Sequence, residues 1–114
     1  RKEVYASTGP RMQVRFFGGW GYAADDATRP DAVVRGYRGG VPMGGELPPR
    51  GRKDGAPRFL LMASKDPIGA NLERVQIVKG WRTKRGELKE KVYDVAVAEK
   101  TGSTVDLATA TYAN

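Results

Sequence analysis

Residues 71–81 alternate between apolar and polar side chains in the manner of a β-strand. Val75, Ile77 and Trp81 occupy alternate positions, so on an extended chain they share one face. Val78 lies on the opposite face, which predicts a strand covered in part on both sides. We therefore expect residues 71–81 to form the core strand of a β-rich domain.

Residues 11–17 alternate in the same way. Met12, Val14 and Phe16 share one face, while Phe17 falls on the other face with the polar residues. This pattern predicts a half-buried strand.

The remaining strand predictions rest on shorter patterns. They are residues 4–7, 58–64, 90–98 and 104–112. Residues 58–64 are a nearly unbroken apolar run, which predicts a strand covered on both faces. Residues 84–87 contain a glycine and predict a hairpin turn between two of these strands.

One short helix is expected over residues 31–37, where Val33, Val34 and Tyr37 have helical spacing and Pro30 suits a first helical position. Gly36 weakens this prediction. Residues 39–45 are rich in glycine, and residues 48–55 are rich in proline, glycine and charge. Both segments predict loops.

The spacing of the strands and the 15 glycines and 7 prolines predict many turns and few helices. With 114 residues there is room for one core. We predict an all-β fold, an antiparallel β-sandwich-like domain with long loops and at most one short helix. It forms one domain over residues 1–114.

The chain has no histidine and no cysteine. Histidine is the commonest general base and metal ligand, and cysteine supplies disulfides and thiolate ligands. A self-sufficient zinc or iron hydrolase is therefore hard to build from this chain, and an enzyme contained wholly within it is the least favoured class.

The formal net charge is +7, which favours anionic partners. The lysines and arginines are scattered, however, and the densest group (Arg50, Arg52 and Lys53) falls in a loop. We expect a solvated basic surface and no nucleic-acid partner, because no nucleic-acid motif accompanies the charge. No apolar run is long enough for a membrane span.

Both ends resemble cut ends. The chain does not begin with Met, residues 1–3 resemble the end of a helix, and residues 109–114 stop within a strand-like pattern. These features predict a fragment of a longer protein. The localisation stays open, and any compartment is compatible with the composition.

Residues 7–11 are the best candidate for an anion-binding site in the sequence. Ser7 and Thr8 supply hydroxyls, Gly9 can adopt positive φ, and Arg11 can grip phosphate or sulfate in a bidentate manner. Two readings stay open: an oxyanion-binding corner, or an ordinary turn at the end of a strand.

Other polar and aromatic features favour structural roles. Asp25 and Asp26 are adjacent, so they predict a loop or a helix cap rather than a paired-carboxylate site. Asp66 precedes a proline and is typical of a turn. Trp20 and Trp81 each follow a glycine and favour core packing over a ligand cleft. Residues 39–45 lack a following helix, which argues against a nucleotide-binding loop.

Several segments in order resemble one known family. They are residues 4–12, 14–20, 40–45, 65–72, 75–81 and 90–96. Together they are similar to the C-terminal portion of a bacterial family, domain-of-unknown-function family 3604, and the resemblance runs over nearly the whole chain. It implies a larger N-terminal part similar to a PHP-type metal-dependent phosphoesterase barrel, and it is compatible with a periplasmic or exported protein.

The resemblance implies that this chain is a non-catalytic accessory domain of a hydrolase for phosphate or sulfate esters. The divalent metal is then expected in the barrel and no cofactor in this piece, and the barrel of the same chain is the expected partner. Thr8 and Arg11 would follow the last helix of the barrel and contact an anionic substrate. Two rivals stay open: a carbohydrate-binding module that stacks sugars on Trp20, Trp81 or Tyr37, and a structural module that forms homo-oligomers.

Overall fold

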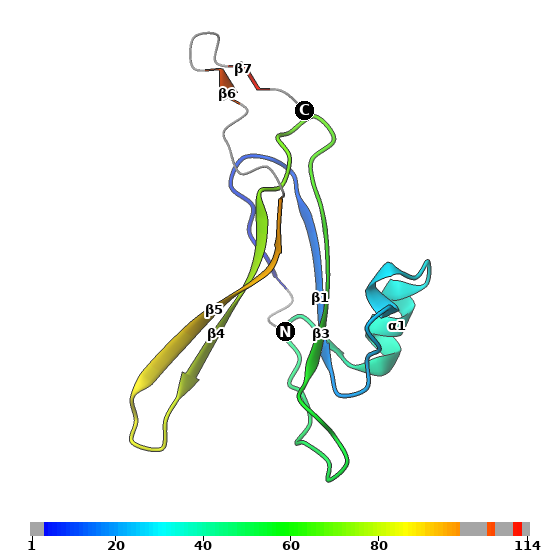
Figure 1. Ribbon diagram of the computed structural model, residues 1–114, viewed down its shortest axis with the longest axis vertical. Coiled ribbons are helices and arrows are strands. Elements are labelled where there is room, and N and C mark those ends of the chain that lie inside the picture. The colour runs from blue at the N-terminus through cyan, green and yellow to red at the C-terminus, as the bar shows by residue number, and fades with distance from the viewer. Residues whose placement is uncertain (1–3, 99–104, 107–110, 113–114) are drawn as a thin grey trace. The chain divides into compact units, whose positions relative to one another are not determined.

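A computed structural model describes residues 4–98, 105–106 and 111–112, with side chains for residues 4–98. The chain divides into two compact units, Arg1–Pro67 and Ile68–Asn114, and we describe each by itself. Strands dominate, and every strand pair among the described residues is antiparallel (Figure 1). One short α-helix is present. The predicted all-β, antiparallel class with at most one short helix is confirmed.

The first unit contains a three-stranded sheet with the order β2–β1–β3. Its strands are β1 (Gln13–Gly19), β2 (Val41–Pro42) and β3 (Arg58–Ser64). β3 has the bounds that its apolar run predicts. It pairs with β1 over the full length, from Gln13 opposite Ser64 to Gly19 opposite Arg58. β2 is much shorter and pairs only with Phe17 and Gly18.

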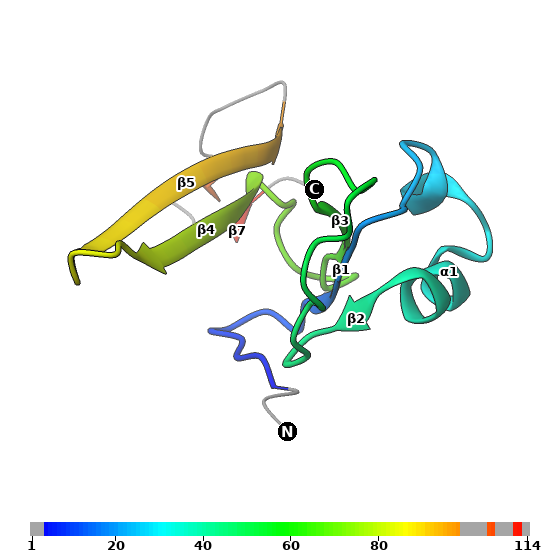
Figure 2. The same ribbon diagram turned by 90° about the horizontal axis from the view of Figure 1, so that it is seen from below.

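Helix α1 (Ala32–Gly39) lies beside this sheet (Figure 2) and begins one residue later than predicted. Phe17 is buried with Tyr22 and Leu60, and these three side chains form the core of the unit. A Cβ on Gly36 would lie 2.6 Å from Cδ2 of Phe17. The glycine that weakened the helix prediction is therefore what lets the helix approach the core, at a cost of about 0.5–1 kcal/mol in helix propensity.

The loop between β1 and α1 is fixed by polar contacts. The Tyr22 hydroxyl donates to the carbonyl oxygen of Gly36 at 2.6 Å. The 3₁₀ helix η1 (Asp26–Thr28) carries the buried Asp26, whose Oδ2 accepts from the backbone N–H of Ala23 at 2.8 Å. Its Oδ1 lies 3.2 Å from Nη1 of Arg35, so helix and loop are joined by an ion pair.

Three predictions for this unit need correction. Phe17, placed on the polar face of its strand, is the most buried large side chain because α1 covers that face, whereas Val14 and Phe16 are half-buried. Residues 58–64 are not covered on both faces, since only Leu60 is buried and Phe59 keeps 48% of its surface exposed. Residues 4–7 are irregular and not a strand, because they have no pairing partner among the described residues.

The second unit is built on a hairpin of β4 (Arg74–Arg82) and β5 (Leu88–Val97), with a register shift at Val75 and Gln76. The predicted turn is confirmed. The backbone N–H of Gly86 donates to the Thr83 oxygen, and that of Thr83 to the Glu87 oxygen, both at 2.9 Å. Gly86 has φ of 89°, a conformation that favours glycine.

The prediction that residues 71–81 form the core strand is wrong. Among the described residues β4 pairs with β5 alone, in a two-stranded sheet, so it has no central position there. Val75 and Ile77 are half-buried, but Val78 is 63% exposed and Trp81 is 39% exposed. Alternation specifies which side chains share a face, but it does not specify that another layer covers the face.

Two short strands, β6 (Val105–Asp106) and β7 (Thr111–Tyr112), pair with each other. The rest of the strand expected over residues 104–112 lies outside the described residues, as do residues 1–3 with their helix-like pattern. The single domain expected over residues 1–114 stays a prediction.

Candidate anion-binding corner

The predicted corner lies on the irregular segment that leads into β1. Gly9 has φ of 90°, a positive value that glycine can adopt. The backbone N–H of Met12 donates to the Pro10 oxygen at 3.0 Å, which tightens the turn just before the strand. Thr8 and Arg11 are both exposed. Their side chains are thus accessible to a ligand, but neither is held in an enclosed site.

The corner already binds one carboxylate of its own chain. Oδ2 of Asp66 accepts from the backbone N–H of Arg11 at 2.9 Å. Asp66 follows β3, and Arg11 precedes β1, so the antiparallel register brings the end of one strand to the start of the other. The Asp66 carboxylate, at a position typical of a turn, therefore accepts from an N–H group that is 55 positions away in the chain. A carboxylate at this N–H occupies a donor that a bound oxyanion would otherwise use.

A hollow of about 260 Å³ lies in the same unit. Its lining residues are Tyr5, Val14, Arg15, Phe16, Phe17, Tyr37, Pro42 and Met43. Aromatic and apolar side chains dominate, and Arg15 is the cation among them. Tyr37 stands edge-on to Phe17, with ring centroids 4.9 Å apart. Such a lining suits a small ligand with a flat apolar part and an anionic group.

Sequence reasoning singled out Tyr37 and the segment that contains Tyr5, but it missed the hollow. Neither Thr8 nor Arg11 lines it. The hollow requires β1, β2 and α1 to meet, and no local pattern contains that information.

The adjacent carboxylates of Asp25 and Asp26 have structural partners, as the loop interpretation implies, but the Asp25 side chain makes no capping hydrogen bond. Asp25 pairs with Arg29 at 3.2 Å, and Asp26 holds Arg35. Arg35 also donates to Asp31 at 2.9 Å, and this hydrogen bond lowers the pKa of the Asp31 carboxyl. Within residues 4–98 and the four described strand residues beyond them, no group of three His, Cys, Asp or Glu side chains could hold a metal ion.

The three aromatic residues considered for sugar stacking have different surroundings. Trp20 is half-buried, and its Nε1–H donates to the Pro48 oxygen at 3.0 Å. Tyr37 is exposed beside the hollow, and Trp81 is part-exposed on β4. Neither tryptophan has the core position that the glycine before it predicted.

No helix in the described parts of the chain is long and apolar enough to cross a membrane.

The fold and these surfaces define a small, basic, all-β protein module with exposed aromatic and cationic side chains. Over residues 1–114 the sequence matches the family described as "Protein of unknown function (DUF3604)", and the chain belongs to this family. A search of curated proteins returned no match, and a search of solved structures returned none.

Proposed function

We propose that this chain is a non-catalytic accessory domain of a larger metal-dependent hydrolase for phosphate or sulfate esters. It packs on a PHP-like catalytic barrel in a longer form of the same bacterial polypeptide. The proposal draws on the family resemblance for the barrel and on the hairpin of the second unit for the packing surface.

The observation that carries the proposal is an apolar face on the hairpin. Val78 pairs with Val92 across the two strands, and Leu88 lies opposite Arg82 on the same face. Val78 is 63% exposed, Leu88 84% and Val92 51%. Glu90 and Asp94 lie on the same face, so its exposed apolar surface is interrupted by carboxylates. Isolated two-stranded hairpins are marginally stable in water, and exposed apolar side chains gathered on one face suit an interaction site. A second protein surface over this face would stabilise the hairpin.

Within residues 4–98, the carboxylates do not gather into a group that fits a catalytic metal. The carboxylates of Asp25, Asp26 and Asp31 are engaged by Arg29 and Arg35, and histidine is absent from the sequence. We therefore assign no catalytic step to this chain, and the proposal places the metal in the barrel.

Association with the barrel tests the packing. The 114-residue chain would be mixed with the separately produced upstream part of the longer polypeptide, and binding measured by isothermal titration calorimetry. Val92→Asp should abolish association, because a carboxylate cannot be desolvated against an apolar partner without a large cost. Lys91→Asp is the matched control: it is the neighbouring residue and faces the other side of the ribbon, and it should retain association.

The same variants distinguish packing on the barrel from the rival function, a structural module that forms homo-oligomers. If Val92→Asp abolishes a concentration-dependent dimer of the 114-residue chain while the barrel shows no binding, the face serves self-association and the packing proposal fails. Analytical ultracentrifugation gives this readout.

The role of Thr8 and Arg11 has its own test in the full-length hydrolase. In this proposal Arg11 contacts the anionic substrate through its exposed guanidinium, and Thr8 adds a hydroxyl donor. Arg11→Ala should lower kcat/KM by an amount equivalent to about 1.5–3 kcal/mol, the size of a lost charged hydrogen bond. Arg52→Ala, on a loop of the same unit, is the control. An unchanged kcat/KM in Arg11→Ala would show that residues 7–11 do not contact the substrate.

The ligand-binding rival is favoured by one observation, the aromatic hollow beside Tyr37. Its test is a titration with neutral and acidic monosaccharides, followed by chemical-shift changes at Tyr37 and Arg15. Shifts confined to this hollow, with no association to the barrel, would favour the rival.

A further inference from the structure

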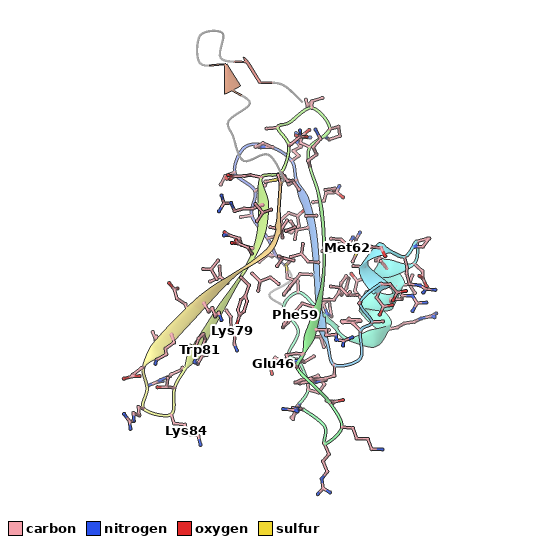
Figure 3. The ribbon with its side chains drawn as sticks, in the orientation of Figure 1. Glu46, Phe59, Met62, Lys79, Trp81 and Lys84 are labelled. Atoms are coloured by element: carbon pink, nitrogen blue, oxygen red, sulfur yellow. The ribbon has the colours of Figure 1, made fainter. Side chains whose placement is uncertain are left out.

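The hairpin has a second face, which gathers cations and aromatic rings. The pleat and the register place Lys79, Trp81, Lys89, Lys91 and Tyr93 on one side. Figure 3 shows the side chains of Lys79 and Trp81 on β4. Trp81 is 39% exposed and Tyr93 41%, so both rings are accessible. We call this set the cationic face. It lies on the side of the hairpin opposite to the apolar face of Val78, Leu88 and Val92.

Two lysines on this face oppose each other directly. Lys79 is the cross-strand partner of Lys91, and Lys89 is the partner of Trp81. Like charges directly opposite in an antiparallel pair are destabilising. Each of the paired ammonium groups lies over a ring: Lys79 Nζ is 5.2 Å from the Trp81 centroid, and Lys91 Nζ is 4.9 Å from that of Tyr93. The rings offset part of the repulsion and leave the positive charge on the surface.

The acidic residues of the hairpin strands lie on the other face. Glu90 is opposite Gly80, and Asp94 is opposite Gln76, whose Nε2 donates to it at 2.7 Å. Glu87, in the turn, lies 3.9 Å from Lys89, but both side chains are more than half exposed. Arg82, Lys84 and Arg85 add charge at the turn. Within the described strands of the hairpin, the three lysines therefore share the face that carries neither Glu90 nor Asp94, whereas the face with these two carboxylates also carries Arg82.

We propose that the cationic face binds single-stranded nucleic acid. Bases stack on Trp81 and Tyr93, and the lysines between them bind phosphates. Proteins that bind single strands combine a positive surface along the backbone with aromatic side chains on which bases stack. Tyr93 is opposite Ile77, four residues from Trp81, so the rings stand about 13 Å apart along the strands and the lysine pair lies between them.

The rings favour a single strand over a duplex. Bases in a double helix are already stacked on their neighbours, so Trp81 and Tyr93 would contribute little to duplex binding. The sequence predicts no nucleic-acid partner, because its lysines and arginines are scattered and no nucleic-acid motif accompanies them. The period of the strands brings three of them together, and this gathering depends on the pairing of β4 with β5.

The test uses the 114-residue chain and a fluorescein-labelled thymidine oligonucleotide of about 12 nucleotides, with anisotropy as the readout. Three lysine–phosphate contacts predict a slope of log K against log salt near −2, since each contributes about −0.7 on a single strand. The double variant Lys79→Gln/Lys91→Gln should reduce the magnitude of this slope by about 1.4. Arg52→Gln/Lys53→Gln removes the same charge from a loop of the first unit and should leave the slope unchanged.

Stacking has a separate readout. Trp81→Ala should weaken oligonucleotide binding by about tenfold, the lower end of the range for one stacked base. Trp81→Phe keeps a ring and should retain most of the affinity. Leu88→Ala removes an exposed apolar side chain from the opposite face and is the matched control, and circular dichroism verifies that each variant is folded.

Competition decides what the face recognises. The proposal expects unlabelled single strands to compete far better than duplex DNA, inorganic polyphosphate or heparin of equal charge concentration. It is overturned if any of these three competes equally well, if Trp81→Ala binds like the parent chain, or if no binding occurs at low salt. The inference does not depend on the proposed accessory role, because Val92→Asp alters only the apolar face.

Discussion

The two units of this chain use the same strand pattern with different outcomes. In the first unit, residues Arg1–Pro67, α1 covers one face of the β1–β3 pair and buries Phe17, Tyr22 and Leu60. In the second unit, Ile68–Asn114, the β4–β5 ribbon is longer, yet its described side chains are exposed or half-buried. The difference shows that a second layer, and not strand length or alternation, creates a core.

The covering layer is made possible by small residues in the helix. Gly36 admits the Phe17 ring, and a Cβ on Gly39 would lie 2.8 Å from Cε1 of Tyr22. No helix packs on β4 or β5 within the described part of the second unit. The first unit thus has the features of a stable core, and the ribbon has those of an interaction surface.

Phe17→Ala should have the largest effect on this comparison. It removes the most buried side chain of the first unit and should lower the free energy of unfolding by about 3–5 kcal/mol. Hydrogen exchange, measured separately for peptides of β1, β3 and α1 and for those of β4 and β5, gives the local readout. Equal loss of protection in both sets of peptides would show that the two units unfold together. The core of the first unit would then also determine the stability of the ribbon.

Gly36→Ala tests the close approach of helix and sheet. Alanine is the better helix former by about 1 kcal/mol, but its methyl group would collide with the Phe17 ring. We expect a net loss of about 1–3 kcal/mol, the usual cost of overpacking, in urea denaturation. Gly21→Ala is the control, because a Cβ there has nothing within 4 Å. A stabilised Gly36→Ala protein would mean that helix propensity outweighs packing at this position.

Tyr22→Phe probes the polar edge of the same core and its dependence on pH. Loss of the hydrogen bond to Gly36 should cost about 0.5–1.5 kcal/mol at neutral pH. Burial, together with the charge of Asp26, raises the pKa of the Tyr22 hydroxyl above its ordinary value. The stabilisation is therefore complete below pH about 10 and is lost as the pH rises through the raised pKa.

Melting temperatures at neutral and strongly alkaline pH measure this effect. Tyr22→Phe should lose less stability than the parent chain on going to alkaline pH, whereas Tyr37→Phe, with an exposed ring, should follow the parent. If the melting temperatures of all three proteins fall equally at alkaline pH, the pH dependence of stability arises from groups other than Tyr22.

Val92→Ala should have the smallest effect. Val92 is half exposed and faces only Val78 across the ribbon, so we expect a change within about 0.5 kcal/mol in the urea midpoint of the 114-residue chain. Leu60→Ala, in the core of the first unit, should cost about 2–5 kcal/mol in the same assay. A large loss of stability in Val92→Ala would mean that another segment covers the ribbon at this position. The second unit would then have a core of its own, as the first unit has.

Much of the local structure could be predicted from sequence. Residues 58–64 gave the bounds of β3, the glycine at position 86 marked the hairpin turn, and Val33, Val34 and Tyr37 indicated α1. Local patterns suffice here because hairpin turns, helix periods and apolar runs are properties of neighbouring residues. The positive φ of Gly9 in the candidate corner is one that the sequence allows, because glycine lacks a Cβ.

The candidate sites were predicted less completely. The hydrogen bond from Arg11 to Asp66 spans 55 positions, and the hollow beside Tyr37 combines β1, β2 and α1. Lys79, Lys89 and Lys91 gave no motif, because only the pairing of two strands places them on one face with Trp81 and Tyr93. Each of these features requires a register or a packing contact between distant segments.

The sequence by itself determined the all-β class, the positions of the main strands and turns, and the two-residue period that assigns each side chain to a face. Tertiary structure alone decided which faces are covered. Phe17 is buried because a glycine-containing helix packs on its side of β1, whereas Val75, Ile77 and Trp81 have the better alternation and remain part-exposed on a two-stranded ribbon. The period of a strand is a property of its own backbone, but burial depends on what another segment places against it.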